Sequence, residues 1–590
     1  MKPPRLDPPP AGPPATSPRR IALDAGLLLV LVLLTFFLRI GDLPPMGEEG
    51  RRARGAINMI ESGDWIVVRQ GGVVFPDRPP MTNWLIAVSG LVRGAVDTVA
   101  MRAPSVSAVL ATVLLLYLYC ARLDSRVTAL TAAASYATFG QVMQIGRLGE
   151  SESVFAFFMA AALLLWHMGF ALRWRPVLVW SLGYSFAGLA ALVKGLQAPV
   201  YFVAATGAYL LLQRRWKWLF GWGQWVGAAC FLLIVAAWQV PYYLRTDLQA
   251  SMDTWFAVVG PRLGLSGLLE NIVSYPLETI GCLLPWSLVL AVLLHRGVRR
   301  RLLEEHPQIG FVLVALIVTY PTVWFSAGAK GRYYIPLYPC VAVVIGSLVD
   351  TLSRAPEDSF AGRIWRLVNR AAILFAVFAV GALAFIQFGG EARFDHFRQT
   401  LLWSAFIVAV AAASVVASRR AMAHRDPWTA GRAVLAAAAL LGTLHMTFWV
   451  DSLLNLRVDL RPTVSALRDR LPSAEKLVSL GPIDPRFAYA YRHLIREIPL
   501  PTTAEDFPPD VEYFCFDWRP TDTLEERHVR RGMKSWSTPG TLPFAWEEIE
   551  RVQIRARPGR PPKVAVVVAR ILRTPGGEPA PPEESPALAD

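Results

Sequence analysis

Charged residues recur where the apolar runs of this chain end. They are Glu48, Glu49, Asp77, Arg78, Glu150, Glu152, Lys194, Lys330 and Arg332. A carboxylate can accept a proton or hold a divalent cation, and an ammonium or guanidinium can hold a phosphate leaving group. If these side chains meet at one membrane face, they suit a polar reaction on a lipid-anchored phosphate.

The same residues also have an ordinary structural explanation. A charge at the centre of a bilayer costs roughly 2.5 to 3.5 kcal/mol on insertion scales, so charged side chains collect at the ends of spans. Lys194 stands out because it lies between the apolar runs 182–193 and 196–212. Its ammonium can bind a lipid phosphate or extend to the interface, and both alternatives stay open. Arg332 and Tyr333 can likewise bind phosphate or form an interfacial belt.

The elements that must position these residues are membrane-spanning helices. Hydrophobic residues make up 54% of the 590 residues, charged residues make up 18%, and the mean hydropathy is +0.38. Uncharged runs of roughly 17 to 20 residues, each long enough to cross a bilayer, recur between residues 25 and 450. The net charge of +14 is spread over short loops, which indicates membrane topology and excludes a nucleic-acid surface. The cysteine spacing shows neither a disulfide framework nor a zinc site.

We expect an α-helical polytopic membrane protein with about thirteen spans and a cytoplasmic N-terminus. The spans are 25–38, 106–120, 127–145, 154–172, 177–193, 196–212, 219–240, 280–294, 309–325, 334–348, 371–388, 401–417 and 434–450. We assign the short apolar segment 81–92, after Pro79 and Pro80, to an interfacial helix. This alternation puts most loop arginines in the cytoplasm and the charged residues named above outside.

One loop breaks the charge rule. The first external loop, 41–102, is predicted to lie outside and yet is basic. It holds Arg51, Arg52, Arg54, Arg69, Arg78 and Arg93. A functional reason for these cations is therefore worth seeking.

The odd number of spans places the chain after residue 450 outside. Residues 464–471 have a helical pattern, and strand-like patterns cover 476–480, 511–516, 550–556 and 563–571. We expect a small external α/β domain at 451–574 after a transmembrane domain at 23–450. Disordered tails are expected at 1–22, in the cytoplasm, and at 575–590.

The first external loop resembles that of the GT-C glycosyltransferases, in particular the lipid A aminoarabinose transferase and protein mannosyltransferase group. In that group the loop holds an acidic pair, a Ser-Gly-Asp-Trp element and a Glu-Lys-Pro-Pro element before Trp-Leu. Here the matching residues are Glu48-Glu49, Ser62-Gly63-Asp64-Trp65, Asp77-Arg78-Pro79-Pro80 and Trp84-Leu85. Weaker matches follow at Lys194-Gly195, Leu284-Pro285-Trp286 and Arg332–Pro339, so the resemblance covers residues 23–450.

The resemblance implies a role for each matching residue. Glu48, with Glu49 beside it, and Glu152 take the places of the family's catalytic carboxylates, and Glu150 is the less favoured match for the second of these. Substrate binding falls to Arg51, Arg78, Lys194, Arg332 and Tyr333. Asp77 matches an acidic residue associated with a divalent cation, but no counterpart is evident for the histidine that helps to bind it in the aminoarabinose enzyme.

The resemblance therefore predicts a multi-pass enzyme of the bacterial inner membrane with its C-terminal domain outside. It would move a sugar from a polyprenyl-phosphate donor to a lipid, glycan or protein acceptor. Exchanges such as Asp to Glu at position 48 change side-chain reach by about one methylene, so altered acceptor choice or a catalytically degenerate homologue are alternatives. A transporter or lipid flippase would need midplane charges or internal repeats, which the sequence does not show. A scaffold would leave the first-loop motifs unexplained.

Overall fold

The computed structural model describes residues 18–76, 78–256, 268–326, 329–424, 426–471, 476–499, 501, 503–518, 542–554 and 565–573. Asp77, most of the predicted N-terminal tail and all of the predicted C-terminal tail lie outside these residues. The chain divides into two compact units. The helical unit holds 1–40, 76–82 and 102–451, and the mixed unit holds 41–75, 83–101 and 452–590. We describe each unit separately.

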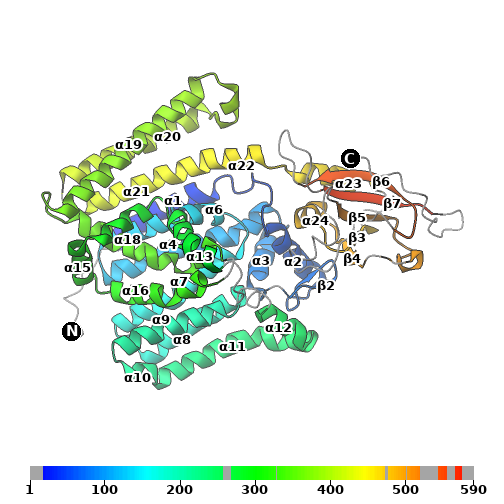
Figure 1. The fold of residues 1–590 in the computed structure, drawn as a ribbon, viewed down its shortest axis with the longest axis horizontal. Coiled ribbons are helices and arrows are strands. Elements are labelled where there is room, and N and C mark those ends of the chain that lie inside the picture. Colours follow the sequence, from blue (N-terminus) through cyan, green and yellow to red (C-terminus); the bar gives the residue numbers. More distant parts are fainter. Residues whose placement is uncertain are drawn as a thin grey trace. The chain divides into compact units, whose positions relative to one another are not determined.

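Helices build the helical unit (Figure 1). They are α1 (Pro18–Val32), η1 (Leu33–Phe37), α4 (Thr98–Leu123), α5 (Arg126–Ala137), α6 (Gly140–Ile145), α7 (Ser151–Ala171), α8 (Pro176–Lys194), α9 (Gln197–Leu212), α10 (Trp216–Leu219), α11 (Trp222–Arg245), α12 (Leu248–Phe256), α13 (Leu268–Cys282), α14 (Ser287–Leu290), η3 (Ala291–Leu294), α15 (Arg296–Glu305), α16 (Ile309–Thr319), α17 (Pro321–Trp324), η4 (Gly331–Leu337), α18 (Tyr338–Ser353), α19 (Phe360–Phe388), η5 (Ala392–Phe397), α20 (Leu401–Ala423), α21 (Pro427–Leu444), η6 (His445–Trp449) and α22 (Val450–Leu456). Because α1 begins at Pro18, residues 18–22 are helical and not the disordered segment that we expected.

The described residues contain nine helices long and apolar enough to cross a membrane, or up to eleven if each of two bent pairs forms one span. The bent pairs are α13 with α14–η3 and α15 with α16–α17, and each bends by 116°. Ten of these eleven match a predicted span, whereas the predicted span 280–294 crosses the bend between α13 and α14 and is not one straight helix. The two remaining predicted spans are α9, which has only 16 residues, and the segment 127–145.

The predicted single span 127–145 is wrong. The helix stops at Ala137, and α6 starts at Gly140 after a break at Thr138 and Phe139. The Gly140 amide then donates a hydrogen bond of 2.8 Å to the Leu284 carbonyl oxygen, which lies in the bend after α13. The break therefore pairs backbone groups of two interrupted helices inside the helical unit.

Small residues allow several helices of this unit to pack closely. A Cβ added at Gly346 of α18 would lie 2.6 Å from the carbonyl oxygen of Thr128 on α5. Gly223 and Gly227, one turn apart on α11, approach the backbone of Pro176 and Trp180 on α8 in the same way. Such small-residue contacts are the usual way in which helices associate in lipid.

The mixed unit combines helices with a sheet. Its elements are α2 (Glu49–Ser62), β1 (Arg69–Gln70), β2 (Val73–Val74), α3 (Met81–Arg93), α23 (Leu460–Arg470), β3 (Val478–Leu480), α24 (Pro485–Tyr491), β4 (Arg496–Ile498), η8 (Ala504–Asp506), β5 (Tyr513–Trp518), β6 (Trp546–Gln553) and β7 (Ala565–Ile571). The helix expected at 81–92 is therefore present as α3.

The five-stranded sheet has the order β4-β3-β5-β7-β6. Strand β3 pairs in parallel with β4 and β5, while β7 pairs antiparallel with β5 and β6. Alternate side chains enter two cores, with Cys515 and Val568 on one face and Phe514 and Val567 on the other. Helices α23 and α24 cover the first face.

The first loop belongs to the same unit as this sheet. Ala53 and Ala56 of α2 and Ile86 of α3 share a core with Tyr489 of α24. The Glu497 amide on β4 donates a hydrogen bond of 3.0 Å to the carbonyl oxygen of Gly71 in the β1–β2 turn. The structure thus groups most of loop 41–102 with the C-terminal domain, whereas our prediction divided the domains at residue 450.

Candidate phosphate-binding and catalytic site

Glu152 and Lys194 form a buried ion pair in the helical unit. Glu152 lies in the first turn of α7 and Lys194 is the last residue of α8, so each charge complements the dipole of its own helix. The Lys194 Nζ atom lies 2.9 Å from Glu152 Oε1, and the side chains are 10% and 5% exposed. The ammonium also lies 5.6 Å from the centre of the Phe155 ring. The cation predicted to bind phosphate therefore contacts the predicted catalytic carboxylate directly.

Arg78 reaches the same place through Ser151. Its guanidinium donates a hydrogen bond of 3.0 Å to the Ser151 hydroxyl oxygen. That hydroxyl lies 3.5 Å from Glu152 Oε2. Ser151, which the sequence did not single out, thus links Arg78 to the carboxylate.

Arg332 approaches the cluster from η4. Its Nη1 atom lies 3.5 Å from Glu150 Oε2, and its charge also attracts Glu152. The Nε atom of Arg332 is buried and has no hydrogen-bond partner among the described residues. Next to it, the Tyr333 carbonyl oxygen accepts a hydrogen bond of 3.4 Å from Gln197 at the start of α9. Arg332 therefore keeps a donor available for a further acceptor.

The cluster carries a surplus of positive charge. Arg78, Lys194 and Arg332 face the two carboxylates Glu150 and Glu152. We call these five residues the cationic cluster. A phosphate group entering it would correct the charge imbalance and accept hydrogen bonds from the cations. The arrangement suits the binding of a phosphate that leaves with negative charge.

The other predicted site residues lie in the mixed unit. Glu48 occupies the N-cap position of α2, where its carboxylate makes no capping hydrogen bond and instead pairs with Arg51 at 2.6 Å. Arg51 also lies over the Phe75 ring, 5.3 Å from its centre. Glu49 is fully buried, and its carboxylate accepts a hydrogen bond of 2.7 Å from the Met46 amide. Glu48, with its more exposed side chain, is therefore the better placed of the two to meet a substrate.

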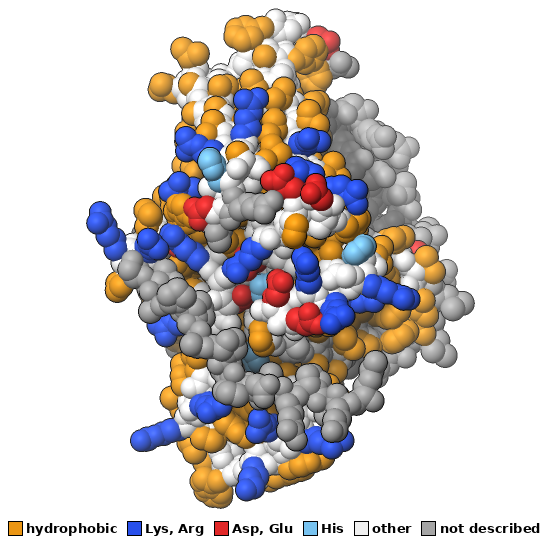
Figure 2. Space-filling view, turned by 90° about the vertical axis from the view of Figure 1, so that its left-hand side faces the viewer, with side chains coloured by type: hydrophobic (Ala, Val, Ile, Leu, Met, Phe, Trp, Pro, Cys, Tyr) orange, Lys and Arg blue, Asp and Glu red, His pale blue; other side chains and the backbone are white. Residues whose placement is uncertain are grey.

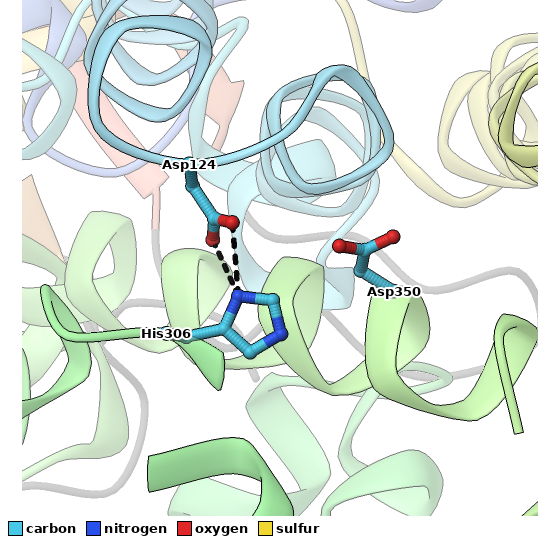
Figure 3. Close-up of side chains that lie close together, drawn as sticks. All are labelled: Asp124, His306 and Asp350. Atoms are coloured by element: carbon cyan, nitrogen blue, oxygen red, sulfur yellow. Dashed lines mark hydrogen bonds and ion pairs between the residues drawn. The ribbon is translucent and has the colours of Figure 1, made fainter. Parts of the chain in front are cut away.

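The metal prediction rested on Asp77, which lies outside the described residues. Among those described, one group has the proximity that a metal site needs, namely Asp124, His306 and Asp350 (Figure 3). Its ligand atoms already have partners. His306 Nδ1 contacts Asp124 at 2.8 Å, His306 Nε2 contacts Thr351 at 3.1 Å, and Asp350 pairs with Arg354 and Ser125. We read the group as a hydrogen-bonded link between α4, α18 and the α15–α16 connection.

Basic side chains spread over the end of the helical unit that carries α15 (Figure 2). The exposed residues in the short connections after α7 and α9 and along α15 include Arg173, Arg175, Arg214, Arg215, Lys217, Arg296, Arg299, Arg300 and Arg301. The cationic cluster instead lies at the opposite ends of α7 and α8 from the first two of these arginines. The sidedness stays a prediction from these same charges, and it assigns this end of the unit to the cytoplasm.

The comparisons with known proteins agree with the fold and with the family resemblance. The family described as Dolichyl-phosphate-mannose-protein mannosyltransferase matches residues 77–240. The structure of ArnT from Cupriavidus metallidurans bound to undecaprenyl phosphate superposes with a TM-score of 0.65. The match covers 94% of this chain and 98% of that chain at 16% identity, so the chain has the GT-C fold.

The curated relatives include undecaprenyl phosphate-α-4-amino-4-deoxy-L-arabinose arabinosyl transferases. The protein from Pseudomonas paraeruginosa is 28% identical over 347 residues, and the one from Pseudomonas aeruginosa PAO1 is 29% identical over 350 residues. Each match covers 58% of this chain and 61% of the relative, which is less than two thirds of its length. The chain is a multi-span membrane protein that resembles the aminoarabinose and mannosyltransferase group, as the first loop indicated.

Proposed function

We propose that this protein is a membrane glycosyltransferase that takes its sugar from a polyprenyl-phosphate donor. The observation that carries the proposal is the cationic cluster, which lies on a GT-C fold at the ends of α7, α8 and η4. Its surplus positive charge and the free Nε atom of Arg332 suit a phosphate diester whose phosphate departs. The relatives are named as transferases of an undecaprenyl-phosphate-linked sugar, and these names support the same donor class.

The proposed reaction breaks one bond and forms another at the anomeric carbon. The acceptor hydroxyl oxygen attacks that carbon, and the bond from carbon to phosphate oxygen breaks with inversion. The polyprenyl phosphate leaves with the electron pair, stabilised by Arg78, Lys194 and Arg332. The acceptor proton passes to a carboxylate, for which Glu48 is our candidate, with Glu49 and Glu152 as supporting carboxylates and with Arg51 and Tyr333 as substrate contacts.

The setting of the reaction is also part of the proposal. We place the protein in a bacterial inner membrane, with the cationic cluster and the mixed unit on the external side. The acceptor is a lipid, a glycan or a protein that reaches this side. If a divalent cation takes part, Asp77 is the candidate ligand, and its role would be to neutralise phosphate charge.

The test measures release of polyprenyl phosphate from a lipid-linked sugar by the purified full-length protein. We expect Arg332→Gln and Glu48→Gln to lower turnover by roughly 10²-fold or more, because each removes a charge from the reacting groups. The matched control is Lys217→Gln, which removes an exposed cation in α10. Full turnover in both site variants would reject the site. Flux of the lipid-linked sugar across proteoliposomes without bond cleavage would instead favour a flippase.

A further inference from the structure

Two of the unexplained first-loop arginines, Arg54 and Arg69, line one pocket of the mixed unit. Arg492, from the C-terminal part of the chain, completes the set. We call this pocket the arginine pocket. It also contains Asn58, Glu61, Gln70 and His493. None of the three arginines belongs to the cationic cluster, and all of them lie within one compact unit.

Each arginine comes from a different element. Arg54 lies on α2 with Ile57, Asn58 and Glu61, and this spacing places all four on one face of the helix. Arg69 begins β1. Arg492 follows α24 with a φ of +68°, a left-handed conformation that usually takes glycine at the end of a helix. The chain therefore holds an arginine where backbone strain would be relieved by a glycine.

The guanidinium-bearing side chains differ in exposure, since Arg54 and Arg69 are half-buried and Arg492 is exposed. Among the described residues, none of them forms an ion pair or a side-chain hydrogen bond. Burial lowers the pKa of Arg54, although a guanidinium stays charged at neutral pH. The nearby carboxylates of Glu61 and Glu497 attract Arg54 only at longer range, since neither forms an ion pair with it. Desolvating Arg54 without an ion-pair partner is unfavourable, so an anion beside it is the expected occupant.

Asn58 adds a second sign that the pocket is incomplete. Its side-chain Oδ1 atom is buried and has no hydrogen-bond partner among the described residues. An amide in this position can turn its NH2 group toward a bound oxyanion, because the two orientations of the group occupy nearly the same space. The pocket thus offers amide and guanidinium donors together.

Arg492 also lines a neighbouring groove of about 390 Å³. Arg461 and Arg468 lie in that groove, but each is paired with a carboxylate of its own segment, Asp459 and Asp469 respectively. The groove therefore has room for a larger molecule, while the unpaired charge is concentrated in the arginine pocket. The arginine pocket itself has a volume of about 20 Å³, which is room for about one water, so the anionic group of a ligand would lie at its mouth beside the exposed Arg492, with the remainder in the groove.

We propose that the arginine pocket binds a phosphate group, separately from the donor phosphate of the cationic cluster. Phosphate fits better than a single carboxylate, because it carries up to two charges and enough oxygens to meet three guanidiniums. After allowance for Glu61 and Glu497, the three arginines still leave positive charge to be neutralised. The phosphate can belong to a lipid headgroup or to a soluble phosphorylated molecule.

The test is calorimetric titration of the full-length protein with inorganic phosphate at fixed ionic strength. We expect the wild type to bind phosphate at two sites. The double variant Arg69→Gln/Arg492→Gln should lower the affinity of one site at least tenfold, because several charge-assisted hydrogen bonds are lost. Lys194→Ala should weaken the other. The matched control, Arg551→Gln, removes an arginine paired with Glu548 on β6 and should leave both sites unchanged.

The two proposals can fail separately. The arginine-pocket proposal is overturned if the Arg69→Gln/Arg492→Gln variant binds phosphate as tightly, and at as many sites, as the wild type. A wild type that binds phosphate only at the Arg492-dependent site, with no site that Lys194→Ala weakens, would count against the donor site alone. Far-ultraviolet circular dichroism and the melting temperature check that each variant is folded.

A second arm of the experiment identifies the source of the phosphate. The titration is repeated in nanodiscs of phosphatidylcholine alone and in nanodiscs that also contain phosphatidic acid. If a lipid headgroup fills the pocket, phosphatidic acid should suppress binding of free phosphate to the Arg492-dependent site. If the ligand is soluble, the two kinds of nanodisc should give equal binding. Both outcomes keep the pocket as a phosphate site.

Discussion

Lys194 is already neutralised by Glu152 before any donor binds. The pair is almost fully buried, and Arg78 and Arg332 act on the same carboxylate. A phosphate that enters must therefore share these cations with Glu150 and Glu152, because only one of the three positive charges is in surplus. The two carboxylates hold the cations in place when the site is empty. They also compete with the released lipid phosphate for the cations, which limits its affinity.

Separate measurements of stability and turnover distinguish the two roles of Lys194. Lys194→Ala leaves the Glu152 carboxylate with less compensation, and we expect a loss of up to about 3 kcal/mol of stability, visible as a lower melting temperature. Lys194→Ala/Glu152→Ala should recover most of that loss, because no buried charge is left unpaired. Transfer should stay low in both variants.

Recovery of transfer together with stability in Lys194→Ala/Glu152→Ala would mean that the pair is purely structural. Asp24→Asn provides the matched control. Asp24 is fully buried and pairs with Arg126 at 2.6 Å, away from the cationic cluster. This variant should lose stability while its turnover per folded molecule stays unchanged.

At this scale the sequence identified the charges but not their partners. Charge type and position at span ends were enough to select Glu152, Lys194 and Arg332. The pairing of Lys194 with Glu152, 42 residues away, depends on how α7 packs against α8 and has no local signal. Ser151 was missed for the same reason, since a serine beside a carboxylate is ordinary until Arg78 is seen to contact it.

Close contact between α5 and α18 depends on a missing side chain. A Cβ at position 346 would lie 2.6 Å from the Thr128 carbonyl oxygen and 3.0 Å from the Ala132 Cβ atom. We expect Gly346→Ala to cost about 1 to 3 kcal/mol, because one helix must move away from the other. Thermal unfolding of the detergent-solubilised protein measures the change.

Gly207→Ala provides the comparison within the same unit. Gly207 lies in α9, and nothing lies within 4 Å of the position that its Cβ would take. We expect a neutral or slightly stabilising effect, since alanine favours the helix over glycine. Equal melting temperatures for the Gly346 and Gly207 variants would contradict the packing argument.

Hydropathy predicted where helices occur better than where they break. The segment 127–145 reads as one apolar run, but its break depends on a backbone contact with Leu284 that is remote in sequence. Strand β4 was missed because Arg-Glu-Ile over three residues carries little strand signal. The continuous apolar runs of β5 and β7, rich in aromatic and β-branched residues, were sufficient to predict those strands.

For the molecule as a whole, charge predicts which side of the membrane each connection faces. In a cysteine-free background, Thr503→Cys of the mixed unit should react with a membrane-impermeant maleimide in intact spheroplasts. Arg214→Cys, an exposed position between α9 and α10, should react only after the membrane is permeabilised. Labelling of both sites before permeabilisation would contradict the proposed topology.

The mixed unit is assembled from chain segments that are made far apart in time. Its α2 and α3 helices are translated early, whereas α23, α24 and the sheet follow after roughly 350 further residues. At about 10 residues per second, the early helices wait on the order of half a minute for the Tyr489 side chain that completes their core. During that interval Ile86 can already pack on Ala53 and Ala56, and this core lacks only Tyr489. The first-loop helices can therefore pack on one another during translation, and their contacts with α24 form last.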